Sequence, residues 1–181
     1  MNLLFRFIKT ILLGLLSREE KRHVLDPSVM TMRVWPTDLD LNFHMNNGRY
    51  LSIMDLGRTD MMVRSGMLKP VLKNGWMPVI AAANMRYRRS LEPLQKYLLK
   101  SRLVCWDEKW VFIEQTFETM DGKTAAVGVV KATILTKKGT LPTADLIAAL
   151  GHEDLQSPPM PQDIAVWMAA EQGLARRAVA A

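Results

Sequence analysis

The sequence predicts an α+β fold in which one long antiparallel sheet wraps around one long, apolar central helix. Three observations support this prediction. Residues 50–64 contain no proline and are apolar on nearly all sides, which is typical of a buried helix. Several segments with strand character follow closely after residue 78. Short turns join consecutive strands, and such short connections require antiparallel pairing.

Length and composition favour one domain with terminal extensions. The chain has 181 residues, of which 49% are hydrophobic, and this is enough for one core. We expect an N-terminal apolar, amphipathic helix within residues 1–25, a single domain over 26–150 and a C-terminal tail with a helix over 151–181. The single cysteine, Cys105, excludes an internal disulfide and suits a reducing, cytoplasmic compartment.

The N-terminal segment is the first predicted element. Residues 2–16 are strongly apolar, but a helix of this length spans roughly 22 Å, less than a bilayer core of about 30 Å. The segment also lacks the pattern of a secretory signal. Its polar side chains share one narrow side of the helical wheel: Asn2, Arg6, Lys9, Thr10 and Ser17. We therefore consider a peripheral membrane helix with its basic side toward lipid headgroups, or a helix docked on its own domain or on a second subunit.

A strand over residues 29–35 leads into a stretch that alternates polar and apolar residues, TDLDLNFHMNNGRY at 37–50. In an extended chain, successive side chains point to opposite faces. The stretch then has a polar side (Asp38, Asp40, Asn42 and His44) and a side that faces the core (Leu39, Leu41, Phe43 and Met45). Asn46 or Asn47 is a favourable N-cap for the central helix.

The remaining strands are expected over residues 79–89, 97–106, 110–119 and 124–136. Asp121-Gly122 is a strong hairpin signal between the last two, and 107–109 makes a similarly tight connection. After the sheet, we predict a short helix over 141–150, an irregular segment over 157–161 that contains three prolines, and an Ala-rich helix over 162–180.

The formal net charge of +6 is distributed unevenly along the chain. Residues 86–102 contain six basic residues against one acidic residue, Glu92, so this stretch carries an excess of five. A local basic patch implies an anionic partner, which we expect to be a nucleic acid, a lipid surface or a small phosphorylated ligand. Nucleic acid is disfavoured because no nucleic-acid motif is present and the aromatic residues are not spaced as a stacking platform.

The alternating stretch contains the groups of a hydrolytic site rather than those of a metal site. Asp38-x-Asp40-x-Asn42 matches the opening of a calcium loop, but Phe43 and Arg49 occupy the positions that require Gly and Glu. Zinc is excluded because no His or Cys lies at ligand spacing from the histidine of this stretch. A carboxylate and an imidazole near a helix start supply a base for water and N–H groups that polarise a carbonyl.

The stretch DLDLNFHMNNGRYL at 38–51 also resembles the signature of hot-dog-fold thioesterases of the 4-hydroxybenzoyl-CoA thioesterase-like group, D-x-D-x-x-x-H-x-N-N-x-x-Y. It looks closer still to the plant acyl-carrier-protein thioesterases, whose motif reads D-x-N-x-H. Downstream, RYRRSLEP at 86–93 and LVCWDEKWVFIEQTFE at 103–118 are similar to a thioesterase-like branch in which some members begin with a hydrophobic segment. The resemblance covers residues 29–136.

This resemblance implies a hot-dog fold, acyl-CoA or acyl-carrier-protein substrates, and no metal or redox cofactor. It also implies a homodimer, or a higher homo-oligomer, in which two subunits form one continuous sheet. Asp40 matches the group's base or nucleophile, and Asn42 and His44 match its plant-type partners. The further acidic or cysteine residue of the plant enzymes has no assigned counterpart here. For Asp40 the alternative is a turn carboxylate that only caps a backbone N–H, and His44 and Asn42 have similar structural alternatives.

Three further sets of residues complete the predicted site. Asn46, Asn47 and Gly48 form the first helical turn, whose N–H groups either hold the thioester oxygen or only cap the helix. Asp55 is a competing carboxylate, which we interpret as structural because Arg58 lies at i+3. Arg88 and Arg89 either bind the phosphates of coenzyme A or an acidic carrier protein, or form a solvated strand face.

We therefore predict a thioesterase that hydrolyses an acyl-CoA or acyl-carrier-protein thioester to free acid and thiol. Two alternatives on the same fold remain, a non-catalytic acyl-binding or membrane-associated protein and a hydratase. The abundant methionines near the central helix either line an acyl tunnel or belong to the core.

Overall fold

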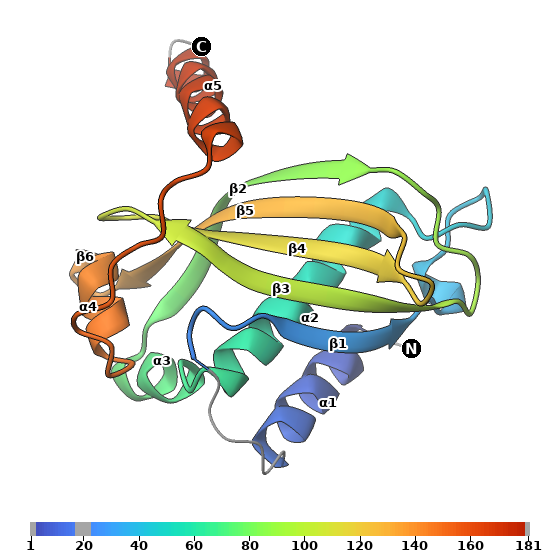
Figure 1. Ribbon diagram of the computed structural model, residues 1–181, viewed down its shortest axis with the longest axis horizontal. Helices are drawn as coiled ribbons and strands as arrows, with labels where there is room; N and C mark the ends of the chain where they lie inside the picture. The colour runs from blue at the N-terminus through green and yellow to red at the C-terminus, as the bar shows by residue number, and fades with distance from the viewer. Residues whose placement is uncertain (1–2, 17–22, 180–181) are drawn as a thin grey trace.

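The computed structural model of the protein describes residues 3–16 and 23–179, with side chains described up to residue 173. A curled, fully antiparallel sheet arches over a long central helix, as Figure 1 shows. The main strand order is β1-β3-β4-β5-β2, with β6 paired to β5. The strands are β1 (Ser28–Arg33), β2 (Met77–Tyr87), β3 (Lys96–Trp106), β4 (Val111–Thr119), β5 (Thr124–Thr136) and β6 (Gly139–Thr140). This arrangement confirms the predicted α+β class.

The central helix, α2 (Asn47–Arg64), begins where the sequence predicts it. The side chain of Asn46 caps the helix by accepting the N–H of Gly48 at 2.8 Å. Mid-helix, Gly57 permits a close approach to the sheet, because a Cβ there would lie 2.5 Å from Ser101 Oγ and 2.6 Å from Gln115 Nε2. The helix is therefore pressed against the concave face of β3 and β4.

The core fills the space between α2 and the sheet. Helix residues such as Ile53 and Met54 are fully buried there, together with Tyr97, Leu99 and Phe117 from the strands. This confirms the expectation that the central helix is a buried one. Burial of a large aliphatic or aromatic side chain contributes about 2 kcal/mol, so this layer supplies much of the stability of the domain.

Both predicted tight connections between strands are present. At the β4–β5 hairpin, Gly122 has a φ of 81°, which is the left-handed conformation that glycine adopts readily. At the β3–β4 connection, Asp107 Oδ1 accepts the N–H groups of Lys109 and Trp110 at 2.8 and 2.7 Å. A short helix, α3 (Leu68–Asn74), was not predicted, because its seven residues show no apolar period and include Pro70.

The alternating stretch does not form an extended segment, so that prediction is wrong. After a 3₁₀ turn over Pro36–Asp38, Leu39 pairs with Met45 in an isolated bridge, and the chain between them turns through Phe43 at a φ of 58°. Leu41 is 97% exposed and Phe43 is 73% exposed, instead of facing the core. Hydrogen bonds between the Asp40 side chain and the backbone favour this compact loop over a strand.

The N-terminal helix, α1 (Leu3–Leu16), packs on α2, as one of the two interpretations expected. Two residues of its polar side point inward rather than toward solvent: Arg6 and Thr10 are buried, and Arg6 is ion-paired with Asp38 at 2.8 Å. Lys9, from the same polar side, is exposed. The interpretation that its basic side meets lipid headgroups is therefore wrong for Arg6. Residues 2 and 17 of the predicted polar side lie outside the described residues. No helix in the described ranges is long and apolar enough to cross a membrane.

Two helices follow the sheet, α4 (Thr143–Ala148) and α5 (Gln162–Val179). The first turns of α5 contact the convex face of the sheet, where Trp167 stacks edge-on against Phe112 and Glu171 pairs with Lys131 at 2.5 Å. The helix then points away from the body of the molecule (Figure 1). The predicted boundary between domain and tail near residue 150 remains a prediction.

Candidate functional site

Asp40 organises the loop between the 3₁₀ turn and α2. Its Oδ1 accepts the backbone N–H of Asn42 at 2.9 Å and that of His44 at 3.4 Å. Its own N–H donates to the carbonyl of His44 at 2.9 Å. The carboxylate is half-buried, and no described residue donates a hydrogen bond to its second oxygen, Oδ2. One oxygen thus holds the loop, while the other remains available to a ligand or to water.

Asp38 lies two residues earlier and has a different environment. Its side chain is fully buried, and it accepts hydrogen bonds from Arg6, from Arg49 and from the backbone N–H of Trp35. Its carbonyl accepts the N–H of Asn46, the N-cap of α2, at 2.8 Å. Asp38 therefore joins α1, the Asp40 loop and the first turn of α2. The sequence carried no signal for this role, because its main partner lies 32 residues away.

The imidazole of His44 is paired with Glu92 rather than with Asp40. Its Nε2 lies 3.3 Å from Glu92 Oε1, and both side chains are partly exposed. The pair connects the Asp40 loop to the segment after β2, and the N–H of Met45 donates to the carbonyl of Leu91 at 3.0 Å in the same region. Asn42 is exposed, and its backbone rather than its side chain contacts Asp40.

The first turn of α2 offers one backbone donor. The N–H of Gly48 is occupied by the Asn46 side chain, and the N–H of Arg49 donates to the Asn46 carbonyl at 2.9 Å. The N–H of Asn47 has no hydrogen-bond partner among the described residues. The Tyr87 hydroxyl at the end of β2 donates to the Asn47 carbonyl at 3.0 Å, which places this turn beside the sheet edge. Of the three residues predicted to hold an oxyanion, Asn47 is therefore the one whose backbone N–H has no partner among the described residues.

Asp55 lies farther along α2 and is ion-paired with Arg58, as the sequence predicted. Arg58 also donates to Gln115 Oε1 at 2.7 Å, and the amide of Gln115 donates to Ser101 Oγ at 2.8 Å. Burial lowers the pKa of Arg58, while the nearby Asp55 carboxylate raises it again. The carboxylate of Asp55 itself is 57% exposed.

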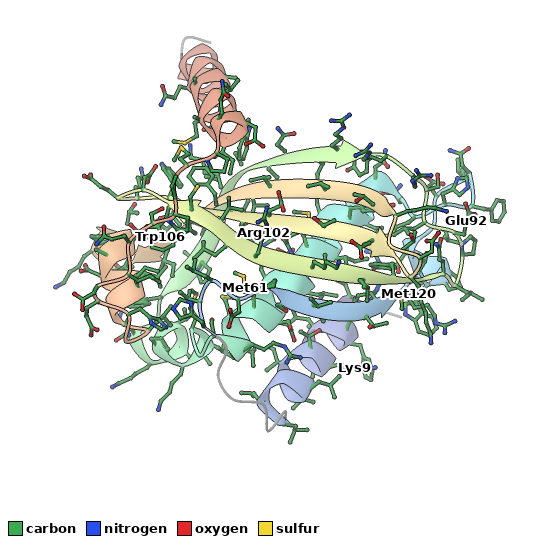
Figure 2. All side chains as sticks on the ribbon, in the orientation of Figure 1. Lys9, Met61, Glu92, Arg102, Trp106 and Met120 are labelled. Atoms are coloured by element: carbon green, nitrogen blue, oxygen red, sulfur yellow. The ribbon has the colours of Figure 1, made fainter. Side chains whose placement is uncertain are left out.

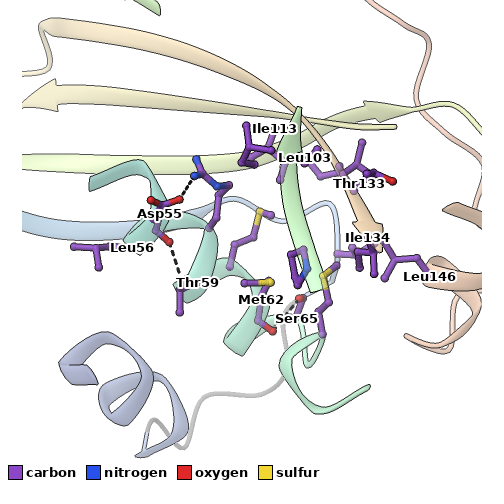
Figure 3. Close-up of a pocket in the computed structure, with 18 of the residues that line it drawn as sticks. Asp55, Leu56, Thr59, Met62, Ser65, Leu103, Ile113, Thr133, Ile134 and Leu146 are labelled. Atoms are coloured by element: carbon purple, nitrogen blue, oxygen red, sulfur yellow. Dashed lines mark hydrogen bonds and ion pairs between the residues drawn. The ribbon is translucent and has the colours of Figure 1, made fainter. Parts of the chain in front are cut away.

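Asp55 and Arg58 contribute polar groups to an otherwise largely apolar cavity of about 600 Å³. Figure 3 shows this cavity between α2 and the strands, with Leu103, Ile113 and Ile134 opposite Met62. Residues from α1 and α4 also contribute to its walls. Asp40 does not line this cavity. The structure thus places the two candidate carboxylates in different surroundings, one in a surface loop and one at an apolar pocket.

The predicted basic stretch is partly neutralised. Lys100 pairs with Glu118 at 2.7 Å and Arg102 with Glu114 at 2.8 Å, both across the β3–β4 pair. Arg88 and Arg89, in contrast, are exposed after the end of β2, and neither has an acidic partner among the described residues. Sequence reasoning missed the two cross-strand pairs because they depend on strand register. Arg88 and Arg89 therefore remain available to bind an anionic ligand.

Comparison of the sequence with known proteins relates this chain to a protein family. A family model of the thioesterase-like superfamily matches residues 34–168. The protein THEM6 of Xenopus laevis is 33% identical over 136 residues, which cover 75% of this chain and 64% of that protein. The chain thus spans less than two thirds of this relative. The THEM6 protein of Drosophila melanogaster is 27% identical over 170 residues, which cover 92% of this chain and 84% of that protein.

Solved structures support the same conclusion for the fold. YbaW of Escherichia coli, described as a probable thioesterase, superimposes with a TM-score of 0.63 at 20% identity and covers 69% of this chain and 96% of its own. A gentisyl-coenzyme A thioesterase gives a TM-score of 0.61 at 17% identity and covers 67% of this chain and 99% of its own. The described chain has the hot-dog fold that the motif around residue 40 predicted.

Proposed function

Because this chain belongs to the thioesterase-like superfamily, we propose that it is a thioesterase that hydrolyses acyl thioesters to free acid and thiol. The substrate is an acyl group carried by coenzyme A or by an acyl-carrier protein. One observation carries the proposal: Asp40 is fixed through Oδ1 by two backbone N–H groups and leaves Oδ2 without a partner among the described residues. A carboxylate held in this way has a fixed orientation, and its second oxygen is still available to accept a proton.

In the proposed reaction, Asp40 acts as the general base. It takes a proton from water as the water oxygen attacks the thioester carbonyl, and the tetrahedral oxyanion accepts a hydrogen bond from the Asn47 N–H. The positive end of the α2 dipole stabilises the same charge. The intermediate then collapses, the C–S bond breaks, and the leaving sulfur takes up a proton. Direct attack by Asp40, through a transient anhydride that water hydrolyses, uses the same two groups.

The cavity beside α2 suits the acyl chain. Its volume of about 600 Å³ lies in the range of small-molecule sites, and its lining includes Met61, Met62 and Met67, whose flexible side chains adapt to chains of different shape. Asp55 is the carboxylate at this cavity and is therefore the second candidate for the catalytic acid or base.

A homodimer is part of the proposal. Among the described residues β2 pairs with β5 and with no other strand, so it is an edge strand, and its exposed side chains include Met77, Ile80 and Tyr87. A long, open and partly apolar edge favours pairing with another strand. A second copy that pairs along β2 would extend the sheet and lie beside the end of β2, which contacts α2 through Tyr87.

The test of catalysis is an assay of the purified full chain against a panel of acyl-CoA esters, with released thiol as the readout. Asp40→Asn keeps the acceptor for the two N–H groups but removes the base, so we expect kcat to fall about 100-fold or more, with an unchanged melting temperature. Asp145→Asn, an exposed acid on α4, serves as the matched control and should retain activity. Full activity of Asp40→Asn together with loss in Asp55→Asn would transfer the role to Asp55.

Arg88 and Arg89 are proposed to bind the phosphates of coenzyme A. The double variant Arg88→Ala/Arg89→Ala should raise the KM for acyl-CoA about tenfold at low salt, with little change in kcat, because charge-assisted bonds to phosphate are lost. The difference should shrink as salt screens the remaining charges. Lys100→Ala/Arg102→Ala removes two cations that are already paired with glutamates and is the control. An unaltered KM at every salt concentration would exclude this role.

A further inference from the structure

The outward face of α1 is apolar. Seven of its large side chains are at least 47% exposed: Leu4, Phe5, Ile8, Leu12, Leu13, Leu15 and Leu16. Leu4 also borders the apolar cavity and Leu13 borders a groove beside β1, while the other five line neither. The helix itself lies at the lower margin of the molecule in Figure 1. Monomeric soluble proteins rarely expose apolar patches larger than a few hundred Å², and such a large patch marks an interaction site.

The inward face of the same helix is polar, which reverses the usual orientation of a docked amphipathic helix. Arg6 and Thr10 are 4% and 5% exposed, and Arg6 donates two hydrogen bonds to the carboxylate of Asp38 at 2.8 and 2.9 Å. A Cβ on Gly14 would lie 2.7 Å from Val63 Cγ1, so the two helices also approach closely. The orientation of α1 is therefore held by a buried ion pair and a close helix contact, and no described residue covers the apolar face.

A basic groove runs beside this face. It has a volume of about 390 Å³, lies between α1 and β1, and is lined by the cations Lys9, Arg33 and Lys96. Lys9, labelled in Figure 2, projects from α1, and neither it nor Lys96 has an acidic partner among the described residues. The acids of the region are already occupied, since Asp60 is paired with Arg64 at 2.7 Å and Asp38 with Arg6 and Arg49. The groove is thus electropositive.

We infer that α1 and this basic groove together form a docking surface for an anionic lipid bilayer. The helix lies in the plane of the membrane, with its apolar face below the headgroups and its axis parallel to the surface. Lys9, Arg33 and Lys96 meet the headgroup phosphates from the flank of the helix. The inference depends on α1 and the groove alone and holds whether or not the chain hydrolyses thioesters.

Charge favours a bilayer over a second copy of the chain as the occupant of this surface. Symmetric pairing through α1 would bring the cations of one groove toward those of the other. The helix has no acidic residue to compensate, since its sequence is LLFRFIKTILLGLL. An anionic bilayer supplies both an apolar interior and negative charge at the required depth.

The test is flotation of the purified full chain with vesicles of phosphatidylcholine alone and of phosphatidylcholine mixed with phosphatidylglycerol. We expect binding to the anionic vesicles that weakens as salt is added. Ile8→Asp/Leu12→Asp changes two exposed positions and should abolish flotation, while the circular dichroism spectrum and melting temperature stay unchanged. Val166→Asp on α5, at an even more exposed apolar position, is the control and should bind normally.

A second pair of variants tests the basic groove. Lys9→Glu/Lys96→Glu should reduce partitioning into anionic vesicles about tenfold or more, since each basic group near such a surface contributes measurably to binding. Lys137→Glu/Lys138→Glu makes the same change in net charge at two exposed positions at the β5–β6 turn and should have a much smaller effect.

Three outcomes would overturn the inference. The first is no binding of the unaltered chain to either vesicle, and the second is equal flotation of all variants. The third is a sedimentation-velocity result in which Ile8→Asp/Leu12→Asp breaks a larger assembly, because the face would then be a contact between copies of the chain.

Discussion

At the scale of single residues, two aspartates in the same motif have opposite environments. Asp38 is fully buried and surrounded by donors, whereas Asp40 is half-buried and retains an oxygen without a partner among the described residues. A buried carboxylate is tolerated only when it is paired, and here Arg6 and Arg49 both supply charge. Asp38 therefore maintains the geometry of the loop, and Asp40 is the aspartate to which we assign the proposed chemistry.

This division leads to a prediction about Arg6. Arg6→Met leaves Asp38 with Arg49, which is itself 26% exposed, so the buried carboxylate loses its better-shielded partner. We expect the free energy of unfolding to fall by about 3 kcal/mol, measured by urea denaturation. Lys9→Met, an exposed cation on the same helix, should change it by less than about 0.5 kcal/mol.

A double-variant cycle with Asp38→Asn separates the ion pair from the loss of packing. If the ion pair is the cause, Arg6→Met should lower the free energy of unfolding much less when residue 38 has already been changed by Asp38→Asn. An equal loss of free energy of unfolding with and without Asp38→Asn would mean that Arg6 contributes through its packing contacts rather than its charge.

At the scale of elements, the proposed dimer depends on the open edge of β2. Ala81→Lys/Ala83→Lys places two charges at exposed positions of this strand, and symmetric pairing would bring them close to their copies. We expect the dissociation constant of the dimer to rise about tenfold or more, as measured by sedimentation velocity over a range of concentrations. Thr31→Lys on β1, at the opposite edge of the sheet, should leave association unchanged. Dissociation caused by Thr31→Lys alone would place the interface at β1.

Elements with local causes could be predicted from the sequence. The start of α2 was predictable because the Asn46 cap acts over two residues, and the β4–β5 hairpin was predictable because Gly122 sits in the turn itself. The Asp40 loop was not, because alternation of polar and apolar residues resembles a strand. Only the tertiary structure shows that the apolar side chains of Leu41 and Phe43 point outward.

At the scale of the whole molecule, the candidate site depends on contacts between distant segments. The sequence predicted the motif of Asp40 and the pairing of Asp55 with Arg58, both of which are local. It did not predict that His44 pairs with Glu92, that Arg6 reaches Asp38, or that α1 shares a cavity with α2 and the sheet. These features arise only when the sheet curls and brings loops and helices together, and no periodicity in one segment encodes them.

The placement of Arg6 has a practical consequence for any shortened form of the protein. Removing residues 1–16 would take away Arg6, one of the two counter-ions of Asp38, open one wall of the apolar cavity and delete the proposed lipid-facing helix in a single step. If a truncated protein lost both turnover and membrane affinity, the loss of the counter-ion, the opened cavity and the missing helix could not be told apart as causes. Point substitutions on the outer side of α1 leave the Arg6 guanidinium paired with Asp38, so they test membrane binding separately from the other two effects.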